Sequence, residues 1–187
     1  MAIYTKTGDA GKTGLLNGER VSKDNPSIEA CGALDELNAF LGMVKVNCSD
    51  AVPECVSVLE ASQQSLITLS SRVSMFGEPS KKPLSSLSPE MVQLLENAID
   101  LMDAQLAPLN GFVLPGKTAQ EAWVHLARTV CRRTERQLVF IVFQIENAKV
   151  DFQNELAFLN RLSDYLFVLA RYLLHKTQPQ TDNVAEM

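Results

Sequence analysis

The sequence lacks an excess of positive charge, and it lacks any long apolar run. Its 187 residues carry 17 Lys and Arg against 22 Asp and Glu, a formal net charge of -5. Proteins that bind nucleic acids or membrane surfaces without specificity are usually basic, and no apolar run approaches the ~18 residues that cross a membrane. We therefore expect no nucleic-acid partner and no membrane partner. Any anion-binding site must be a local cluster of basic residues.

Cysteine is scarce, and its spacing forms no C-x-x-C pair. The four cysteines are Cys31, Cys48, Cys55 and Cys131. Most of them fall within helical patterns, where a small buried thiol is the usual role, and this usage is typical of a reducing compartment. The opening MAIYTKTGD lacks the apolar region of a secretory signal and the Arg- and Ser-rich pattern of a transit peptide. We expect a cytoplasmic location; a mitochondrial one would require a transit peptide ahead of this sequence.

Several familiar catalytic arrangements are also missing. The sequence contains no G-x-S-x-G motif and no Cys–His dyad. Its two histidines, His125 and His175, lack the spacing of metal ligands. No pair of carboxylates is placed convincingly for acid–base work. The chemistry is therefore expected to depend on binding and charge stabilisation, or on a nucleophile that the protein does not supply.

A helical pattern does extend over most of the chain. Residues 1–25 are the exception, because they are rich in Gly, Thr, Lys and Asp and predict a short strand, turns and a loop that orders around a ligand. Pro26 suits a first helical turn, and apolar residues recur at helical spacing from there to Val44. Further helices are expected at 53–76, 88–106, 118–146 and 150–176. Such helices, joined by short loops, predict an all-α protein built as a helical bundle.

The length suits one domain with a sizeable core, and 46% of the residues are apolar. We predict a single domain over residues 1–187. Within it, 1–25 form a ligand-binding loop, 26–177 form the helical bundle and 178–187 form a flexible tail.

Residues 111–118, GFVLPGKT, match the phosphate-loop pattern G-x-x-x-x-G-K-[ST]. A phosphate loop needs a buried strand before it and consecutive backbone N–H groups around the phosphate. Here a helical segment precedes the motif, and Pro115 has no N–H to donate. Thr118 and Glu121 fit a helix capping box instead. We therefore interpret the match as accidental.

The expected helix 118–146 carries two stripes when its residues are placed at 100° intervals. The core stripe comprises Ala127, Cys131, Thr134, Leu138, Ile141 and Ile145. The polar stripe flanks the core and comprises Glu121, His125, Arg128, Arg132 and Glu135, with Arg136 beside it. Three neighbouring guanidiniums suit a polyphosphate. A solvated face with an Arg132–Glu135 pair explains the spacing equally well, and both interpretations stay open.

Two other helices carry polar pairs on one face. Asn160 and Asp164 are four residues apart in an otherwise apolar helix, which favours a partner group, although a buried pair that fixes packing register is the alternative. Asp35 and Asn38 share a face of the first helix. Asp35 is placed to pair with an arginine of another helix or subunit, or it is an ordinary solvated charge.

These segments together resemble the ATP:cob(I)alamin adenosyltransferases of the propanediol-utilisation type. The matching stretches are IYTKTGDAGKTGL, GERVSKD, IEACGALDELNAFLG, FVLPG, HLARTVCRRTER and LNRLSDYLFVLARY. The resemblance implies a five-helix bundle with an N-terminal ATP-binding loop, assembled as a homotrimer with sites between subunits. It implies transfer of the 5′-deoxyadenosyl group of ATP to the cobalt of cob(I)alamin, with triphosphate as the leaving group and Mg²⁺ assisting. A flavoprotein-type reductase and an adenosylcobalamin-dependent enzyme are the further partners it suggests.

The resemblance also assigns roles to residues. Arg128 matches an arginine that pairs across a subunit boundary with the aspartate matching Asp35, and Phe112 matches the aromatic that excludes the lower axial ligand of the corrin ring. The expected catalytic residues are Arg132, Phe112, Asp35 and Arg128. The expected ATP-binding residues are Thr5, Lys6, Thr7, Gly8, Thr13, Gly14, Lys23, Arg132, Arg133, Glu135, Arg136 and Asn160. The expected cobalamin-binding residues are Phe112, Val113 and Asp164, and Mg²⁺ is expected on the ATP phosphates with Glu135 as the candidate protein ligand.

The residues agree with this chemistry, because cob(I)alamin is itself the nucleophile and needs no side chain to activate it. The sequence also lacks D-x-H-x-x-G, the loop that gives a histidine to cobalt in other cobalamin proteins. Lys117 and Trp123 depart from the family, which usually has a glycine and a small residue there. Two alternatives are a non-catalytic cobalamin carrier and a phosphotransferase, and the latter lacks a clear group to orient the acceptor.

Overall fold

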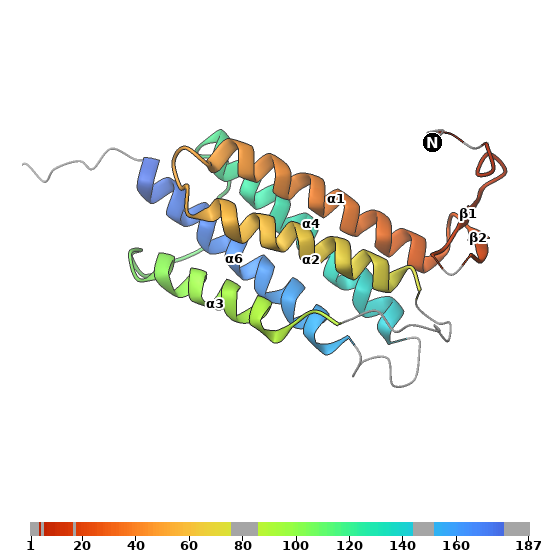
Figure 1. The fold of residues 1–187 in the computed structure, drawn as a ribbon. Coiled ribbons are helices and arrows are strands. Elements are labelled where there is room, and N and C mark those ends of the chain that lie inside the picture. Colours follow the sequence, from red (N-terminus) through yellow and green to blue (C-terminus); the bar gives the residue numbers. More distant parts are fainter. Residues whose placement is uncertain (1–3, 5, 17, 76–85, 144–151, 178–187) are drawn as a thin grey trace, which may run out of the picture.

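The computed structural model describes residues 4, 6–16, 18–75, 86–143 and 152–177. Within these ranges the chain forms five helices and one two-stranded sheet (Figure 1). The helices are α1 (Pro26–Cys48), α2 (Cys55–Val73), α3 (Pro89–Asp103), α4 (Ala119–Val142) and α6 (Gln153–Thr177). The strands are β1 (Lys12–Gly14) and β2 (Arg20–Ser22). The prediction of a five-helix bundle is confirmed.

Three helices begin where polar caps predict. The side-chain oxygens of Asn25, Ser88 and Thr118 each accept a hydrogen bond from a first-turn backbone N–H, at 2.9, 3.2 and 3.2 Å respectively. These caps satisfy N–H groups that the helix itself leaves unpaired. The accidental nature of the phosphate-loop match is also confirmed, because α3 and an irregular segment precede it and Thr118 caps α4.

Other boundaries differ from expectation. Helix α2 begins at Cys55 and has no side-chain cap at Glu54. Helix α4 ends at Val142, and the predicted end at 146 lies outside the described residues, as does the predicted tail 178–187. The expectation of a single short strand near the N-terminus was incomplete. The two strands pair antiparallel, with Thr13 opposite Val21.

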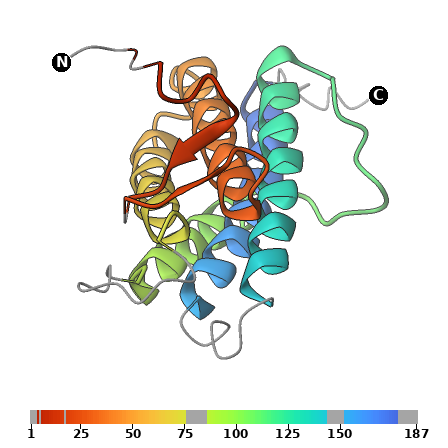
Figure 2. The same cartoon turned by 90° about the vertical axis from the view of Figure 1, so that its right-hand side faces the viewer.

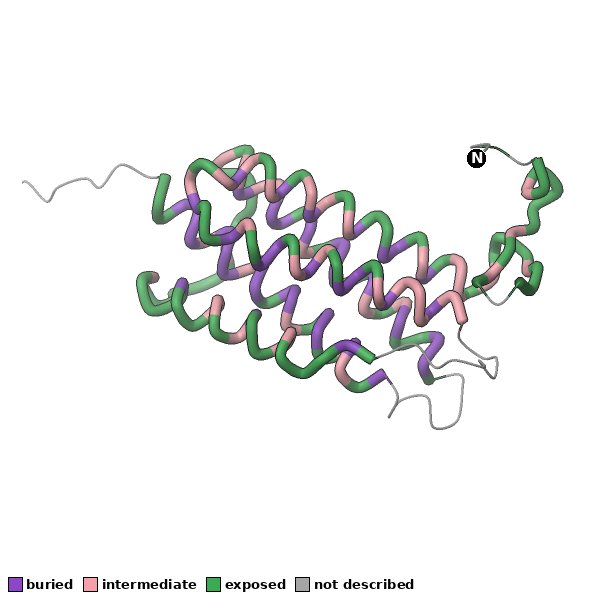
Figure 3. The backbone as a smooth tube through the Cα atoms, viewed as in Figure 1, coloured by how far each residue is buried: buried purple, intermediate pink, exposed green. Residues whose placement is uncertain are grey.

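The helices share one core. Helix α4 packs against both α1 and α6, α2 packs on α1, and α3 packs on α6, an arrangement visible along the bundle axis in Figure 2. Each helix turns a buried face inward (Figure 3). The fully buried large side chains include Leu37, Leu41, Leu59, Leu66, Leu95, Leu138, Phe158 and Tyr165. Among the described residues, no helix is long and apolar enough to cross a membrane.

Helices α1 and α4 run antiparallel, which sets where the candidate site residues lie. The hydroxyl of Thr134 donates to the backbone oxygen of Ala33 at 3.0 Å, and the Trp123 and Phe40 rings lie 6.4 Å apart. The β hairpin directly precedes α1 and sits at the end of the bundle where α1 begins (Figure 1). The segment 107–118, which leads into α4, lies at the other end.

Candidate active site

The core stripe predicted for α4 is confirmed within the described residues. Ala127, Cys131, Thr134, Leu138 and Ile141 are all buried, while Ile145 lies outside those residues. The stripe anchors α4 because its apolar side chains face α1 and α6. The thiol of Cys131 also donates to the backbone oxygen of Leu159 on α6, at 3.3 Å. The arginines of α4 therefore project from a firmly packed helix.

Arg132 and Arg136 form the exposed part of the polar stripe. Among the described residues, neither guanidinium makes a salt bridge or a side-chain hydrogen bond, so the Arg132–Glu135 pair, one of the two interpretations of the stripe, is not formed. Glu135 instead accepts a hydrogen bond from the Asn160 amide of α6, at 3.2 Å. Two guanidinium forks beside a fixed carboxylate and amide give a polar surface suited to a polyphosphate. We call this surface, formed by Arg132, Glu135, Arg136 and Asn160, the arginine face.

Two predicted site residues are engaged elsewhere. Arg133 forms a salt bridge with Glu36 of α1, which places it apart from the arginine face. Asp164 accepts from Arg161 at 2.7 Å, and Arg161 also reaches Glu96 of α3 at 3.0 Å. Adjacent residues on a helix point about 100° apart, which is why Arg133 reaches α1 while Arg132 stays on the arginine face.

The prediction for two residues of the polar stripe was wrong. Glu121 and His125 were expected to flank the core, but both are buried, with exposed fractions of 0% and 4%. One carboxylate oxygen of Glu121 accepts from the backbone N–H groups of Gly116 and Lys117, at 2.8 and 3.1 Å. Burial is the largest cause that lowers the pKa of His125, because it disfavours the charged ring. These two side chains are therefore part of the interior that supports the preceding loop.

The loop before α4 presents an unusually exposed aromatic ring. Phe112 has an exposed fraction of 106%, Leu114 is also exposed, and Val113 is half-buried. Together with the end of α6, including Arg171 and His175, this loop lines a groove of about 550 Å³. Exposed apolar side chains beside a groove commonly mark a surface to which a ligand or another protein binds. Gly116 adopts φ 102°, a conformation that favours glycine.

The N-terminal segment gathers exposed cations around a turn. Lys6, Lys12, Arg20 and Lys23 are all exposed, and Arg20 donates to the backbone oxygens of Thr7 and Lys12. Sequence reasoning did not single out Arg20, because its role is to join two stretches of backbone. A Cβ added to Gly8 would lie 3.6 Å from the ammonium nitrogen of Lys23.

The other residues predicted in this segment form part of the same hairpin. Thr13 and Gly14 belong to β1, while Thr5 lies outside the described residues. The segment also carries the exposed carboxylates Asp9, Glu19 and Asp24, so its lysines, rather than its net charge, are the candidate donors to the phosphates of a nucleotide. We call residues 6–24 without Asn17 the hairpin segment.

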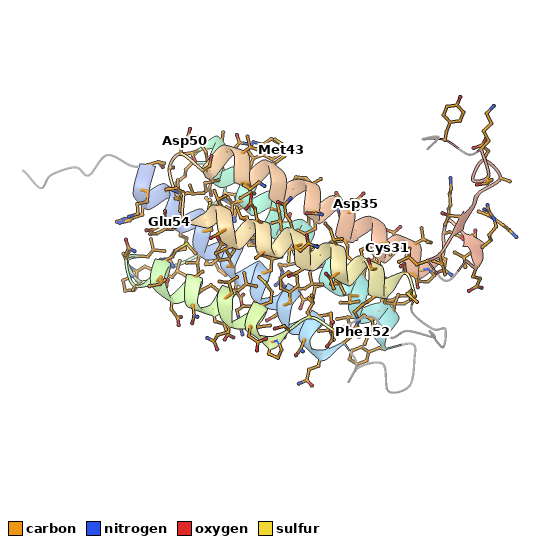
Figure 4. The ribbon with its side chains drawn as sticks, in the orientation of Figure 1. Cys31, Asp35, Met43, Asp50, Glu54 and Phe152 are labelled. Carbon is orange, nitrogen blue, oxygen red and sulfur yellow. The ribbon has the colours of Figure 1, made fainter. Side chains whose placement is uncertain are left out.

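Asp35 lies in a separate groove between α1 and α2, next to the hairpin segment. The groove measures about 600 Å³ and is also lined by Gly14, Asn38 and Ser70. Figure 4 shows Cys31 and Asp35 one turn apart along α1. Within the described part of the chain, Asp35 has no salt-bridge partner, and Arg128 contacts His125 rather than Asp35. One chain therefore holds Asp35 and Arg128 in different places.

The sequence profile of the cobalamin adenosyltransferase family matches residues 3–173 of this chain. The corrinoid adenosyltransferase of Bacillus subtilis is 35% identical over 173 residues, which cover 91% of this chain and 86% of the relative. The chain belongs to the cobalamin adenosyltransferase family.

The curated relatives include longer proteins. The corrinoid adenosyltransferase PduO of Salmonella typhimurium is 42% identical over 171 residues, 91% of this chain but 49% of the relative. This chain thus spans about half the length of that PduO. A solved structure matches nearly the whole length of this chain. It is the structure of a variant PduO-type ATP:corrinoid adenosyltransferase from Lactobacillus reuteri, complexed with cobalamin and ATP. It is 32% identical, covers 91% of this chain and 92% of its own, and has a TM-score of 0.83.

The two positions that depart from the family pattern, Lys117 and Trp123, both lie near the start of α4. The backbone N–H of Lys117 donates to Glu121, so any residue other than proline makes that contact. Trp123 is half-buried, and its ring lies 6.4 Å from that of Phe40 on α1. Lys117 also lines the groove with Phe112, and the Trp123 side chain contributes to the packing of α4 on α1.

Proposed function

We propose that this protein transfers the 5′-deoxyadenosyl group of ATP to the cobalt of cob(I)alamin. The observation that carries the proposal is the arginine face: Arg132 and Arg136 stand exposed without a carboxylate partner among the described residues, on a helix fixed by its core. Family membership and the cobalamin- and ATP-bound relative support the same assignment.

The reaction needs charge stabilisation more than acid–base chemistry. Cob(I)alamin supplies the electron pair that forms the cobalt–carbon bond, while the bond between C5′ and the triphosphate oxygen breaks. Negative charge then accumulates on the departing triphosphate. Arg132, Arg136 and the lysines of the hairpin segment are placed to stabilise it, since fixed donors are most effective where charge develops.

Mg²⁺ assistance fits this set of residues. Mg²⁺ is usually held by one or two carboxylates together with substrate phosphates. Glu135 is the carboxylate of the arginine face, and its hydrogen bond from Asn160 fixes its position. Magnesium would supply additional charge for the triphosphate, and Glu135 would orient it.

We also propose that the site is completed between copies of this chain arranged as a homotrimer. Asp35 and the hairpin segment belong to one flank of the bundle, whereas Arg128 and the arginine face belong to α4 and its junction with α6. An interface that joins two different surfaces of the same chain closes into a ring when the rotation permits. Such a ring would bring Asp35 of one copy to Arg128 of the next.

Exposed apolar side chains provide further support for association. Phe112 and Leu114 are exposed on the loop before α4, and Leu126, Phe140 and the C-cap residue Phe143 are exposed along α4 and at its far end. Several large apolar side chains exposed along one helix and its preceding loop are consistent with an association surface.

A spectroscopic assay tests the reaction. The protein is mixed with Mg·ATP and cobalamin under strong reduction, and the corrin spectrum and the phosphate products are followed. Adenosylcobalamin formed together with intact triphosphate is the expected result. ADP without a cobalt–carbon bond would support phosphoryl transfer instead, and cobalamin binding without product would support a carrier.

Complementation tests the shared site. Asp35→Asn and Arg132→Ala disable different contributions, and co-expression of the two inactive variants is expected to restore about a quarter of wild-type activity in randomly mixed rings. Each variant alone is the control. If both contributions came from the same chain, the mixture would be as inactive as its parents.

A further inference from the structure

A buried set of contacts runs from the loop before α4 to Arg128. Glu121 Oε2 accepts from the backbone N–H groups of Gly116 and Lys117, at 2.8 and 3.1 Å. Glu121 Oε1 lies 3.1 Å from His125 Nε2. On the other side of the ring, Arg128 Nε donates to His125 Nδ1 at 3.4 Å. The set joins the loop that carries Phe112 to the arginine expected at the subunit boundary.

Glu121 and His125 are buried, so few hydrogen-bond partners are available to them. Glu121 has no exposed surface, His125 is almost fully buried, and the ring of Phe167 meets the His125 ring edge-on at 6.2 Å. Among the described residues, Glu121 Oε1 and His125 Nε2 have no well-aligned hydrogen-bond partner, although they face each other at 3.1 Å. Burying a polar atom without a hydrogen-bond partner costs free energy. Each of these two atoms is therefore the available partner of the other.

The arginine decides which ring nitrogen carries the proton. A guanidinium only donates hydrogen bonds, so Nδ1 must accept from Arg128 and a neutral ring must carry its hydrogen on Nε2. In that form the Nε2 hydrogen is on the side of the ring that faces Glu121 Oε1, 3.1 Å away. Along the set, the loop donates to Glu121, the ring turns its Nε2–H side to Glu121 Oε1, and Arg128 donates to the ring.

We propose that Glu121 and His125 are positioning residues that hold the loop carrying Phe112 and the side chain of Arg128 in a fixed relation, through the Nε2–H form of His125. The kinetic part of this inference rests on the proposed function. The ring tautomer does not, because it is a property of the protein alone.

Nitrogen-15 NMR of histidine-labelled protein tests the tautomer without any substrate. The sequence has only two histidines, so His175→Gln assigns the signals. Long-range proton–nitrogen correlations are expected to show a neutral His125 ring protonated on Nε2 at pH 7. A ring protonated on Nδ1, or a charged ring, would overturn the proposal, whatever reaction the protein catalyses.

Substitution of Glu121 by Gln tests the positioning role with almost no change in volume. If the amide oxygen keeps the two loop N–H groups, the amide NH₂ faces His125 Nε2. The ring must then accept at Nε2 and carry its hydrogen on Nδ1, where it meets the donor of Arg128. We expect KM for cobalamin to rise about five- to tenfold, while KM for ATP changes by less than about twofold.

Glu155→Gln is the matched control, because Glu155 is equally buried and accepts from the Leu87 backbone and from Arg72, away from this set. It is expected to lower thermal stability without separating the two KM values. Glu121→Gln is also expected to have less effect when Arg128 is already Lys, which lacks Nε. Equal changes in both KM values, or full additivity with Arg128→Lys, would contradict the positioning role.

Discussion

The hairpin segment and the arginine face differ in what holds them. Residues of the arginine face project from α4 and α6, whose inner faces are buried in the common core. The hairpin segment contributes no buried residue, and its described contacts are mainly hydrogen bonds of its own backbone and of Arg20. One half of the proposed site is therefore organised by folding, while the other depends on local hydrogen bonds.

This difference assigns the two halves different tasks. Groups that stabilise a developing charge are most effective when they are already in position, since reorganisation during the reaction is costly. A segment with little buried surface has low local stability and is suited to closing around a bound ligand. We infer that the arginine face mainly sets kcat, whereas the hairpin segment mainly sets affinity for ATP.

The largest effect is expected at the arginine face. Arg132→Ala should lower kcat about a hundredfold, because it removes a donor from the leaving triphosphate. Thermal stability should change little, since the side chain is exposed and has no partner among the described residues. The matched control is Arg133→Ala, which removes an exposed salt bridge with Glu36. A comparable loss of kcat in both variants would contradict the separation of the two arginines.

The next effect is expected at Phe112. Phe112→Ala should slow the reaction about tenfold when it starts from cob(II)alamin, and much less when it starts from pre-reduced cob(I)alamin. The reason is that the ring is proposed to exclude the lower axial ligand, which makes cobalt easier to reduce. Leu101→Ala, an exposed apolar residue on α3 outside this groove, is the control. Equal slowing from both starting states would remove the role assigned to Phe112.

Much of this organisation could be predicted from local signals. The starts of α1, α3 and α4 follow from caps, and the core stripe of α4 follows from helical periodicity, because both depend on neighbours within one turn. The burial of Glu121 and His125 could not be predicted in this way. It depends on backbone N–H groups of the preceding loop and on Phe167, which is far away in sequence.

The hairpin and the adjacent arginines Arg132 and Arg133 also depend on contacts that local sequence patterns do not predict. Residues of β1 pair with residues of β2, and Arg20 bonds to the backbone of Thr7. The spacing of residue types along the sequence does not indicate such contacts. The motif CRRTER resembles the family as a unit, yet only the structure separates Arg132 from Arg133. The orientation depends on Glu36 of α1, a tertiary partner that lies in a separate stretch of the sequence, 97 residues away.

A smaller effect is expected in the hairpin segment. Arg20→Ala should raise KM for ATP about fivefold and leave kcat nearly unchanged, because it removes the guanidinium that joins the Thr7 and Lys12 backbones. Lys45→Ala is the control for loss of one partly exposed cation, since Lys45 pairs with Glu60 outside both halves. A fall in kcat without a change in KM would show that the hairpin segment acts on the chemical step.

The smallest effect is expected at the cap of α4. Thr118→Ala should lower the free energy of unfolding by about 1 kcal/mol, because the first-turn N–H of Glu121 loses its acceptor. Ser88→Ala removes the equivalent cap of α3 and should cost a similar amount. Chemical denaturation gives the stability, and kcat should stay unchanged in both variants because the core stripe still fixes α4. If Thr118→Ala lowered kcat while Ser88→Ala did not, the arginine face would depend on the α4 cap as well as on the core.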